Sequence, residues 1–407
     1  MKKIYVKMIM VLAGLMITGN IYANDTVQIH GFMSQGYLKS DGNNYLAESK
    51  DGSFQFNEMG LNFKMQATDK LQIGMQFFAR DMGPIGNDEI VLDWAFADYK
   101  FKDYLGLRAG KIKSPIGFYH ETRDVDILRT SILLPSAVYD ENLRDSANAI
   151  HGVGIYGDVT TDFLGNFTYQ ALVGTQNIST DGGTAKYISQ TLFDIQHVGL
   201  DSILAYSLQW VDPSSHLRIG GTCFFTEIEA DGVTQNKKKW DGISGGLFEV
   251  PEGTAMDNRT RNIEEYIGSI EFTWNDLLVA YEYKVLKTTG IFNIYFPEFT
   301  ITSLAPLDIL GYYGLVSYRF LPFFEAGIYY GEFFVDANDR DGSKREVDYL
   351  SWQKDFAVSL KFDINDNWII KLETHYFDGA ANLNLELNPG TNAKYWWLYA
   401  AKVSYVF

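Results

Sequence analysis

The 407-residue sequence has one cysteine, nine prolines and 34 basic residues against 51 acidic ones. A single cysteine excludes a disulfide framework and a cysteine-based zinc site. The formal charge of −17 argues against a nucleic-acid partner, because binding to a phosphate backbone needs a basic surface. Beyond residue 23 no apolar run approaches the roughly 18 residues of a membrane-spanning helix. The lack of such a run excludes a helical membrane protein.

Aromatic residues and glycine are abundant instead. The chain has 28 Phe, 26 Tyr, 8 Trp and 37 Gly, and 46% of its residues are hydrophobic, which is enough for an ordered fold. A membrane-spanning β-barrel is compatible with this composition, because the polar inner face of a barrel dilutes its apolar residues.

The first residues have the pattern of an export signal. Lys2, Lys3 and Lys7 precede an uncharged segment from Met8 to Thr18, and a small residue, Ala23, follows at a suitable cleavage position. The uncharged segment is too short to span a bilayer. We therefore expect residues 1–23 to be a signal peptide that is cleaved after Ala23, and residues 24–407 to form the mature protein.

The remaining chain alternates between apolar and polar residues with a period of two. In the segment 356–364 the apolar residues Phe356, Val358 and Leu360 alternate with Ala357, Ser359 and Lys361. Side chains of a strand point alternately to its two faces, so each such segment has one apolar and one polar face. No segment after residue 23 keeps a capped helical period over three turns. The sequence therefore predicts an all-β protein.

The connections between the predicted strands are alternately short and long. The short ones lie at 68–70, 102–104, 161–163, 212–214, 275–276, 321–322 and 365–367. The long ones cover 41–52, 81–89, 114–148, 176–201, 231–262, 289–309, 336–351 and 378–394. Seven short and eight long connections separate sixteen strands. Short turns on one side and long loops on the other predict a closed, antiparallel, sixteen-stranded transmembrane β-barrel rather than a soluble sandwich.

The C-terminal segment carries a family resemblance. Residues 395–407 end in Phe407, and Tyr399, Ala401, Val403 and Tyr405 share one face. This pattern resembles the terminal strand that Gram-negative outer-membrane porins present to the barrel-assembly machinery. The resemblance implies a location in the outer membrane, contact with its lipid and lipopolysaccharide, and a homotrimer. Physically, this last strand must pair with the first one, residues 27–38, to leave no unpaired edge in lipid.

A second, local resemblance involves residues 107–117, which read LRAGKIKSPIG. This segment is similar to the passage from strand to loop 3 in the phosphate-selective porin O and P family. In that family loop 3 folds into the barrel and nearby basic residues attract phosphate. The resemblance implies such a role for Arg108, Lys111 and Lys113. The following segment 114–148, however, holds six acidic residues against three arginines, which predicts mild rather than strictly anionic selectivity.

The 35-residue connection 114–148, called loop 3 below, is also a candidate on physical grounds. The lumen of a sixteen-stranded barrel is too wide to discriminate between small solutes unless something narrows it. Loop 3 contains the apolar residues Ile132, Leu133 and Leu134, which would be costly to expose to water. Packing them against the inner wall would fold the loop into the pore, although an external lid stays an alternative. Acids and bases that face each other there would create a transverse field that favours polar solutes.

These arguments predict a passive channel for small hydrophilic solutes and ions, with no cofactor and no metal. The candidate constriction and solute-binding residues are Arg80, Arg108, Lys111, Lys113, His120, Glu121, Arg123, Asp124, Asp126, Arg129, Arg144, Arg218, Arg319 and Lys361. A phosphate- or anion-selective porin is the first alternative. A barrel enzyme or an adhesin is a more remote one, because no nucleophile can be assigned to any of the six histidines.

Two motifs give weak indications of a dinucleotide site and of a calcium site. Residues 152–157 fit G-x-G-x-x-G, but a dinucleotide site needs a helix after the motif and here a strand continues. Residues 336–342 resemble half of a calcium-binding loop, but Arg340 occupies a ligand position and no glutamate follows at the twelfth position.

Overall fold

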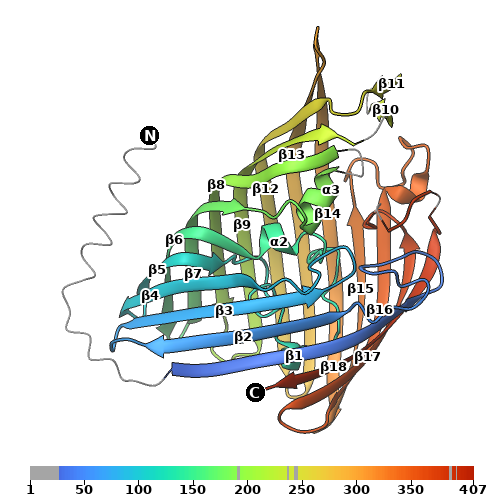
Figure 1. Ribbon diagram of the computed structural model, residues 1–407. Coiled ribbons are helices and arrows are strands. Elements are labelled where there is room, and N and C mark those ends of the chain that lie inside the picture. Colours follow the sequence, from blue (N-terminus) through green and yellow to red (C-terminus); the bar gives the residue numbers. More distant parts are fainter. Residues whose placement is uncertain (1–26, 190–192, 236–237, 243–245, 385–386, 391) are drawn as a thin grey trace.

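The computed structural model describes residues 27–407 with the exception of 190–192, 236–237, 243–245, 385–386 and 391. The expected signal peptide, residues 1–23, lies outside the described residues. Among the described residues sixteen strands form one closed barrel, in which every hydrogen-bonded pair of neighbours is antiparallel (Figure 1). Two further strands, β10 and β11, form a separate hairpin. The predicted fold class is confirmed.

The strands follow one another around the barrel in chain order. The barrel strands are β1 (Val27–Ser40), β2 (Asn57–Gln66), β3 (Leu71–Asp81), β4 (Val91–Lys102), β5 (Leu105–Lys113), β6 (Ala149–Thr161), β7 (Gly165–Asn177), β8 (Phe193–Val211), β9 (Leu217–Thr234), β12 (Ala255–Trp274), β13 (Leu277–Tyr295), β14 (Thr300–Leu321), β15 (Phe324–Phe334), β16 (Trp352–Asp363), β17 (Trp368–Gly379) and β18 (Tyr395–Val406). The hairpin between β9 and β12 consists of β10 (Lys238–Gly242) and β11 (Gly246–Val250).

The helical elements are short and lie in the long connections. They are η1 (Asp126–Leu128), α2 (Arg144–Ala147), α3 (Gly183–Ser189) and η2 (Asp348–Leu350). None of the helices in the described part of the chain is long and apolar enough to cross a membrane.

The first and last strands close the barrel, as the sequence predicts. β1 pairs with β18 from Phe32↔Val406 to Ser40↔Leu398. The carbonyl of Phe407 also accepts a 3.0 Å hydrogen bond from the backbone N–H of Gly31. The wall therefore has no unpaired strand edge at this seam, which a lipid environment requires.

The two faces of each strand differ in the way the period-two pattern predicts. In β18 the side chains of Tyr399 and Val403 are 49% and 37% exposed, whereas those of Leu398 and Lys402 are 0% and 3% exposed. Exposed apolar side chains on one face and buried or polar ones on the other define an outer surface suited to lipid and an inner surface that surrounds the lumen.

The aromatic residues of the outer face gather near the strand ends. Trp274, Trp368 and Phe163 are exposed beside short turns, and Tyr330 and Tyr395 are exposed towards the long connections. Amphipathic rings prefer the two interfaces of a membrane, so this distribution marks two girdles.

All seven short turns lie between consecutive strands where they are predicted, but three of the eight long connections are predicted too long. The loop 176–201 includes the start of β8, and the loop 231–262 includes the end of β9 and the start of β12. The third differs most. The predicted loop 289–309 is mostly strand, because β13 and β14 pair continuously from Leu277↔Tyr318 to Tyr295↔Thr300 and leave only 296–299 as a turn. Residues such as Ile291, Ile294 and Ile301 have side chains that favour strands, which explains the extension. The long β13–β14 hairpin rises above the neighbouring rim of the barrel in Figure 1.

The assignment of faces predicts opposite outcomes for two neighbouring substitutions in β2. Leu61 points outward and is 36% exposed, whereas Asn62 points to the lumen. Leu61→Arg places a cation in the lipid and should lower the free energy of unfolding by about 2–4 kcal/mol, as measured by urea titration in lipid vesicles. Asn62→Arg should change it by less than about 1 kcal/mol. Equal losses for the two variants would show that the faces are wrongly assigned.

Candidate functional site

Loop 3 connects β5 to β6 and packs its apolar residues against side chains of the inner wall. Ile132 and Leu133 belong to a buried cluster with Phe377 of β17 and Trp396 of β18. A second cluster joins the loop residues Ile116, Leu134, Val138 and Tyr139 to the wall residues Ile267 and Tyr313. Both clusters remove from water the side chains that would be costly to expose in an external loop.

A buried carboxylate of β13 accepts hydrogen bonds from two separate segments of loop 3. Glu282 is 0% exposed and accepts from the backbone N–H of Phe118 at 2.9 Å and from the Tyr139 hydroxyl at 2.5 Å. Its remaining partners are the hydroxyls of Ser269 and Tyr313, at 2.5 and 2.6 Å. Four donors satisfy this carboxylate, so its burial fixes the loop in place.

A second buried carboxylate, on β17, accepts hydrogen bonds from the middle of loop 3. Glu373 accepts from the backbone N–H groups of Ile132 and Leu133 at 2.7 and 2.9 Å. It also accepts from the Ser359 hydroxyl at 2.6 Å and contacts the His375 ring at 2.9 Å. Loop 3 is thus bound to β13 through residues 118 and 139, and to β17 through residues 132 and 133.

Three lysines of the wall strands bind loop 3 as well. Lys361 donates to the carbonyl of Ile127 at 2.7 Å, and Lys371 donates to the carbonyl of Ser131 at 2.9 Å. Lys402 lies 2.9 Å from Asp126, the first residue of η1. Loop 3 therefore supplies partners for these buried lysines, in addition to the wall acids Glu58 and Asp363 that pair with Lys402 and Lys361.

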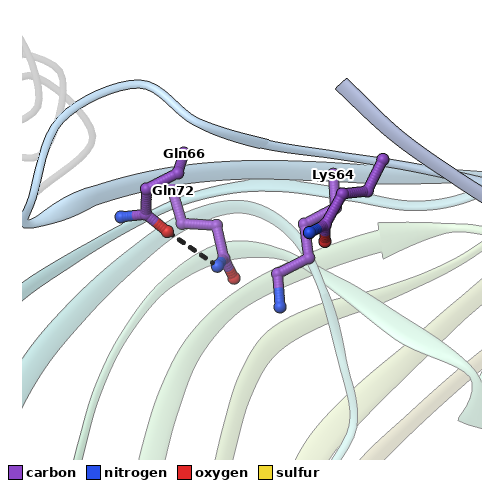
Figure 2. Close-up of a pocket in the computed structure, with 4 residues that line it drawn as sticks. Lys64, Gln66 and Gln72 are labelled. Atoms are coloured by element: carbon purple, nitrogen blue, oxygen red, sulfur yellow. Dashed lines mark hydrogen bonds between the residues drawn. The ribbon is translucent and has the colours of Figure 1, made fainter. Parts of the chain in front are cut away.

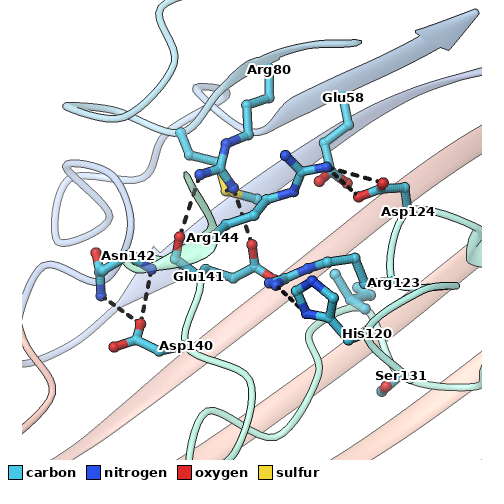
Figure 3. A network of polar contacts seen from close by, with 12 residues as sticks. Glu58, Arg80, His120, Arg123, Asp124, Ser131, Asp140, Glu141, Asn142 and Arg144 are labelled. Atoms are coloured by element: carbon cyan, nitrogen blue, oxygen red, sulfur yellow. Dashed lines mark hydrogen bonds and ion pairs between the residues drawn. The ribbon is translucent and has the colours of Figure 1, made fainter. Parts of the chain in front are cut away.

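The other half of loop 3 is held by a network of ion pairs against β3 and β4 (Figure 3). Glu141 lies between Arg80 of β3 and Arg123, at 3.1 and 2.5 Å. Arg144 lies between Asp93 of β4 and Asp124, at 3.1 and 2.9 Å. Lys113, at the end of β5, completes the network with a 3.2 Å contact to Asp124.

The electrostatics of this network follow from burial and charge. Burial alone would raise the pKa of Glu141, but the positive charges of Arg123 and Arg80 outweigh burial and lower the pKa to about 2. Asp140 faces no such cation at close range, so burial raises its pKa to about 6. Burial, helped by Arg123, lowers the pKa of His120 well below its usual range, and this imidazole is therefore neutral.

Most of the predicted constriction residues are inaccessible rather than exposed to the lumen. Those with less than a tenth of their surface exposed are Arg80, His120, Arg123, Asp124, Asp126, Arg144 and Lys361. Arg129 is also largely covered and pairs with Asp126 at 3.1 Å. In this structure these residues hold loop 3 and cannot contact a passing solute, which corrects their assignment as solute-binding groups.

Lys111 is a further correction, because it lies on the other face of β5 from Arg108. Its cross-strand neighbours are Ala95 and His151, and its ammonium group donates to the carbonyl of Leu92. Residues three positions apart on a regular strand point to opposite faces. Arg108 faces the lumen, so Lys111 faces outward and does not line the constriction. Arg319 lies at the short-turn end, where it pairs with Glu325 and Asp363.

Three of the predicted constriction residues remain partly exposed on the lumen side near loop 3. Glu121 of loop 3 is exposed, and the side chains of Arg108 and Arg218 are 25% and 30% exposed. Desolvation by the surrounding wall raises the pKa of Glu121, and Arg108, Lys113 and Arg218 oppose this effect. One acid of the loop therefore lies among cations of β5 and β9.

Both lumen-facing arginines are held in a fixed orientation by aromatic rings. The guanidinium of Arg108 lies 4.2 Å from the centre of the Tyr156 ring and forms a 2.8 Å ion pair with Asp98. The guanidinium of Arg218 lies 3.9 Å from the centre of the Phe118 ring, which belongs to loop 3. Stacking and hydrogen bonding reduce the freedom of both cations without removing their charge from the lumen.

Sequence reasoning missed the wall residues that hold the loop. They are Asp93, Glu282, Lys371, Glu373 and Lys402. The period-two alternation of the sequence predicts that these side chains lie on the polar, inner face of their strands. Which of them meets loop 3 depends on the register of strands that are far apart in the chain.

The other motifs take no part in this site. The G-x-G-x-x-G motif at 152–157 lies inside β6, with no helix after it. In the segment that resembles a calcium loop, Asp336 lies 3.8 Å from Lys344. Within the described residues no group of three or more His, Cys, Asp or Glu side chains could hold a metal ion.

The fold defines a closed sixteen-stranded β-barrel, and this architecture is shared with solved outer-membrane proteins. The chain is similar to OmpF of Salmonella typhi, with a TM-score of 0.56 and 12% identity over 94% of this chain and 97% of that one. It is similar to the anion-selective porin from Comamonas acidovorans, with a TM-score of 0.54 and 11% identity over 94% and 99% of the two chains. The outer membrane channel DcaP of Acinetobacter baumannii gives a TM-score of 0.54 and 8% identity over 94% and 97%.

No model of a protein family and no curated protein sequence matches this chain. At 8–12% identity, the structural likeness establishes a shared fold. It does not extend to the phosphate-selective family, whose resemblance to residues 107–117 stays a hypothesis.

The ion-pair network predicts that a buried acid matters far more than an exposed one. Asp124→Asn leaves Arg144 and Lys113 without their shared counter-charge, and it should lower the free energy of unfolding by about 3–5 kcal/mol. Asp103, which pairs with Lys100 at 2.9 Å on the surface, is the matched control. Asp103→Asn should produce no measurable change in the same urea titration. A similar response of the two variants would contradict the anchoring role of the network.

The pKa values of Asp140 and Glu141 predict that loop 3 is most stable in mild acid. The raised pKa of Asp140 means that stability increases as pH falls through about 6. The lowered pKa of Glu141 means that its contribution is present above its usual pKa and is lost as pH falls towards about 2. Hydrogen exchange of residues 123–148, corrected for intrinsic rates, should therefore show maximal protection at about pH 4–5.

Variants separate the two arms of this pH profile. Asp140→Asn should remove the decline in protection as pH rises from about 4 to about 6. Glu141→Gln should lower protection at neutral pH and weaken its further loss in acid. If the protection of the wild type stayed constant between about pH 8 and about pH 3, neither carboxyl group would control the stability of the loop.

Proposed function

We propose that the protein is an outer-membrane porin that forms a water-filled channel for the passive diffusion of small hydrophilic solutes and ions. The proposal assigns it a transport role without catalysis. The fold supports it, since a closed barrel with an apolar outer surface and a polar inner face separates lipid from a lumen. The similarity to OmpF, to the anion-selective porin and to the DcaP channel agrees with this function.

The observation that carries the proposal is the attachment of loop 3 to the inner wall. The loop is bound to β13 through Glu282 and to β17 through Glu373. It would fill one side of the lumen and leave a narrower passage bordered by Glu121, Arg108 and Arg218. An acid that faces bases across such a passage would orient polar solutes and exclude apolar ones.

Weak ion selectivity follows from the pairing of charges around this passage. Arg108 is partly neutralised by Asp98, and Lys113 by Asp124. Lys111, the remaining basic residue of the phosphate-selective pattern, faces outward. A strong anion preference at this passage needs cations without such partners, so we favour a general diffusion channel over the phosphate-selective alternative.

The proposal includes the surroundings of the barrel. The exposed apolar belt and its aromatic girdles suit contact with outer-membrane lipid and lipopolysaccharide. Phe407 is 49% exposed at the end of β18, where the barrel-assembly machinery would recognise it. Export by a signal peptide that is cleaved after Ala23 and assembly into a homotrimer complete the proposal.

Planar-bilayer recording tests the channel directly. The purified protein should insert in steps of constant conductance, and conductance should rise roughly in proportion to salt concentration because no strong binding site controls it. Deleting Arg123–Leu134 removes the part of loop 3 that contacts β15 to β18. This deletion should increase both the conductance and the largest sugar that crosses in a liposome-swelling assay.

A point variant covers the case in which the deletion does not fold. Glu121→Gln removes the exposed acid of loop 3 and should shift the reversal potential in a potassium chloride gradient towards chloride. Glu48→Gln, at an exposed position of the first long connection, makes the same change of charge and should leave it unaltered. Absence of stepwise currents from the wild type would refute the channel. Unchanged conductance, size limit and reversal potential would refute the role of loop 3.

A further inference from the structure

A small polar recess lies on the lumen side of β1–β3, away from loop 3. It is lined by Gln28 of β1, Lys64 and Gln66 of β2, and Gln72 of β3, and its volume is about 190 Å³ (Figure 2). Gln66 and Gln72 flank the turn between β2 and β3, so the recess lies at the short-turn end of the barrel. At roughly 30 Å³ for each water, it has room for about six water molecules or a solute of similar size.

The register of the strands explains why a recess exists at this place. Lys64 is paired with Gln28 on one side and with Gly74 on the other. Gly74 has no side chain to occupy the wall beside Lys64, and a Cβ atom added there would come within 3.1 Å of the Trp94 ring. The Trp94 ring covers the wall at Gly74, so no side chain of β3 stands directly beside Lys64 in this register.

Hydrogen bonds orient the amides of the recess. The Gln66 side chain donates to the carbonyl of Thr68 at 2.7 Å, and its oxygen accepts from Gln72 at 3.2 Å. The Gln72 oxygen and the whole Gln28 amide have no partner among the described residues, as the contacts of the recess show. An amide both donates and accepts hydrogen bonds, which suits hydroxyl groups of a solute.

Lys64 differs from the other lumen-facing cations because no described acid or carbonyl group contacts its ammonium. The cations near loop 3 each have such a partner, for example Arg108 with Asp98 and Lys361 with Ile127. Asp98 lies across from Gln72, but it is occupied by Arg108 and Tyr156. Lys64 therefore presents an uncompensated positive charge beside oriented amides.

We infer that this recess is a subsite for a small hydroxylated carboxylate of the sugar-acid class, an inference that rests on the proposed channel function. The carboxylate would pair with Lys64, and the hydroxyl groups would bind the amides of Gln28 and Gln72. A charge-assisted contact combined with neutral hydrogen bonds favours such a solute over a neutral sugar or a bare anion. Because the recess lies at the short-turn end, a solute that enters from the long-loop side would meet it last, and a solute that enters from the short-turn side would meet it first.

Gluconate block of chloride current in planar bilayers tests the subsite. Gluconate should reduce wild-type current more strongly from the short-turn side than from the long-loop side. Lys64→Met should raise the half-blocking concentration about tenfold, the change expected for loss of one charge-assisted hydrogen bond. Lys64→Arg keeps the charge and should restore most of the block. Lys70→Met is the matched control, because it removes a lysine from the same turn without changing the lining of the recess.

The outcomes separate this inference from the channel function itself. Lack of conductance in the wild type refutes the channel and with it the subsite. Normal conductance with equal gluconate block in Lys64→Met and Lys70→Met refutes the subsite alone. Equal block by glucose would show that the charge of Lys64 plays no part, and equal block by inorganic phosphate would show that the amides play none. Either of these results would overturn the proposed solute class.

Discussion

The need to pair every backbone polar group of the wall determines the rest of this structure. In lipid an unpaired N–H or C=O group costs several kcal/mol, so a sheet can cross a membrane only when it is closed. The pairing of β1 with β18, extended by the mutual hydrogen bonds of Gly31 and Phe407, provides this closure. Closure then imposes one apolar and one polar face on each strand, because the outside contacts lipid and the inside does not.

The closed wall also determines how charge is distributed inside. Acids and bases on the inner faces of sixteen strands lie in a confined space in which desolvation is costly. Loop 3 supplies counter-charges and backbone groups for many of them: Asp126 lies beside Lys371 and Lys402, and Glu141 beside Arg80. Such pairs contribute little net stability compared with apolar packing, but an incomplete pair is strongly destabilising. The network therefore specifies one position of the loop.

This arrangement divides the inner wall into two parts with different properties. Loop 3 covers the wall from β12 to β18 through the contacts of Glu282, Glu373 and Lys361. It also covers part of β3 and β4 through Arg80 and Asp93. The remaining wall between β1 and β9 keeps polar groups that are accessible, among them Arg108, Arg218 and Lys64. Solutes that cross the proposed channel would meet the second part, which is where selectivity can arise.

The sequence by itself determined the fold class, the number of strands, the short turns and the face of most side chains, because alternation with a period of two is a local property of a strand. The same rule separates Arg108 from Lys111, which lie three positions apart and face opposite sides. Only the tertiary structure decided that β13 and β14 extend through the expected loop 289–309, since pairing with a neighbour stabilises strands that local sequence leaves open. Only the tertiary structure decided that Glu282 and Glu373 hold loop 3, because these contacts join residues 143 to 241 positions apart. Such contacts depend on the register of the closed sheet, and no local pattern encodes that register.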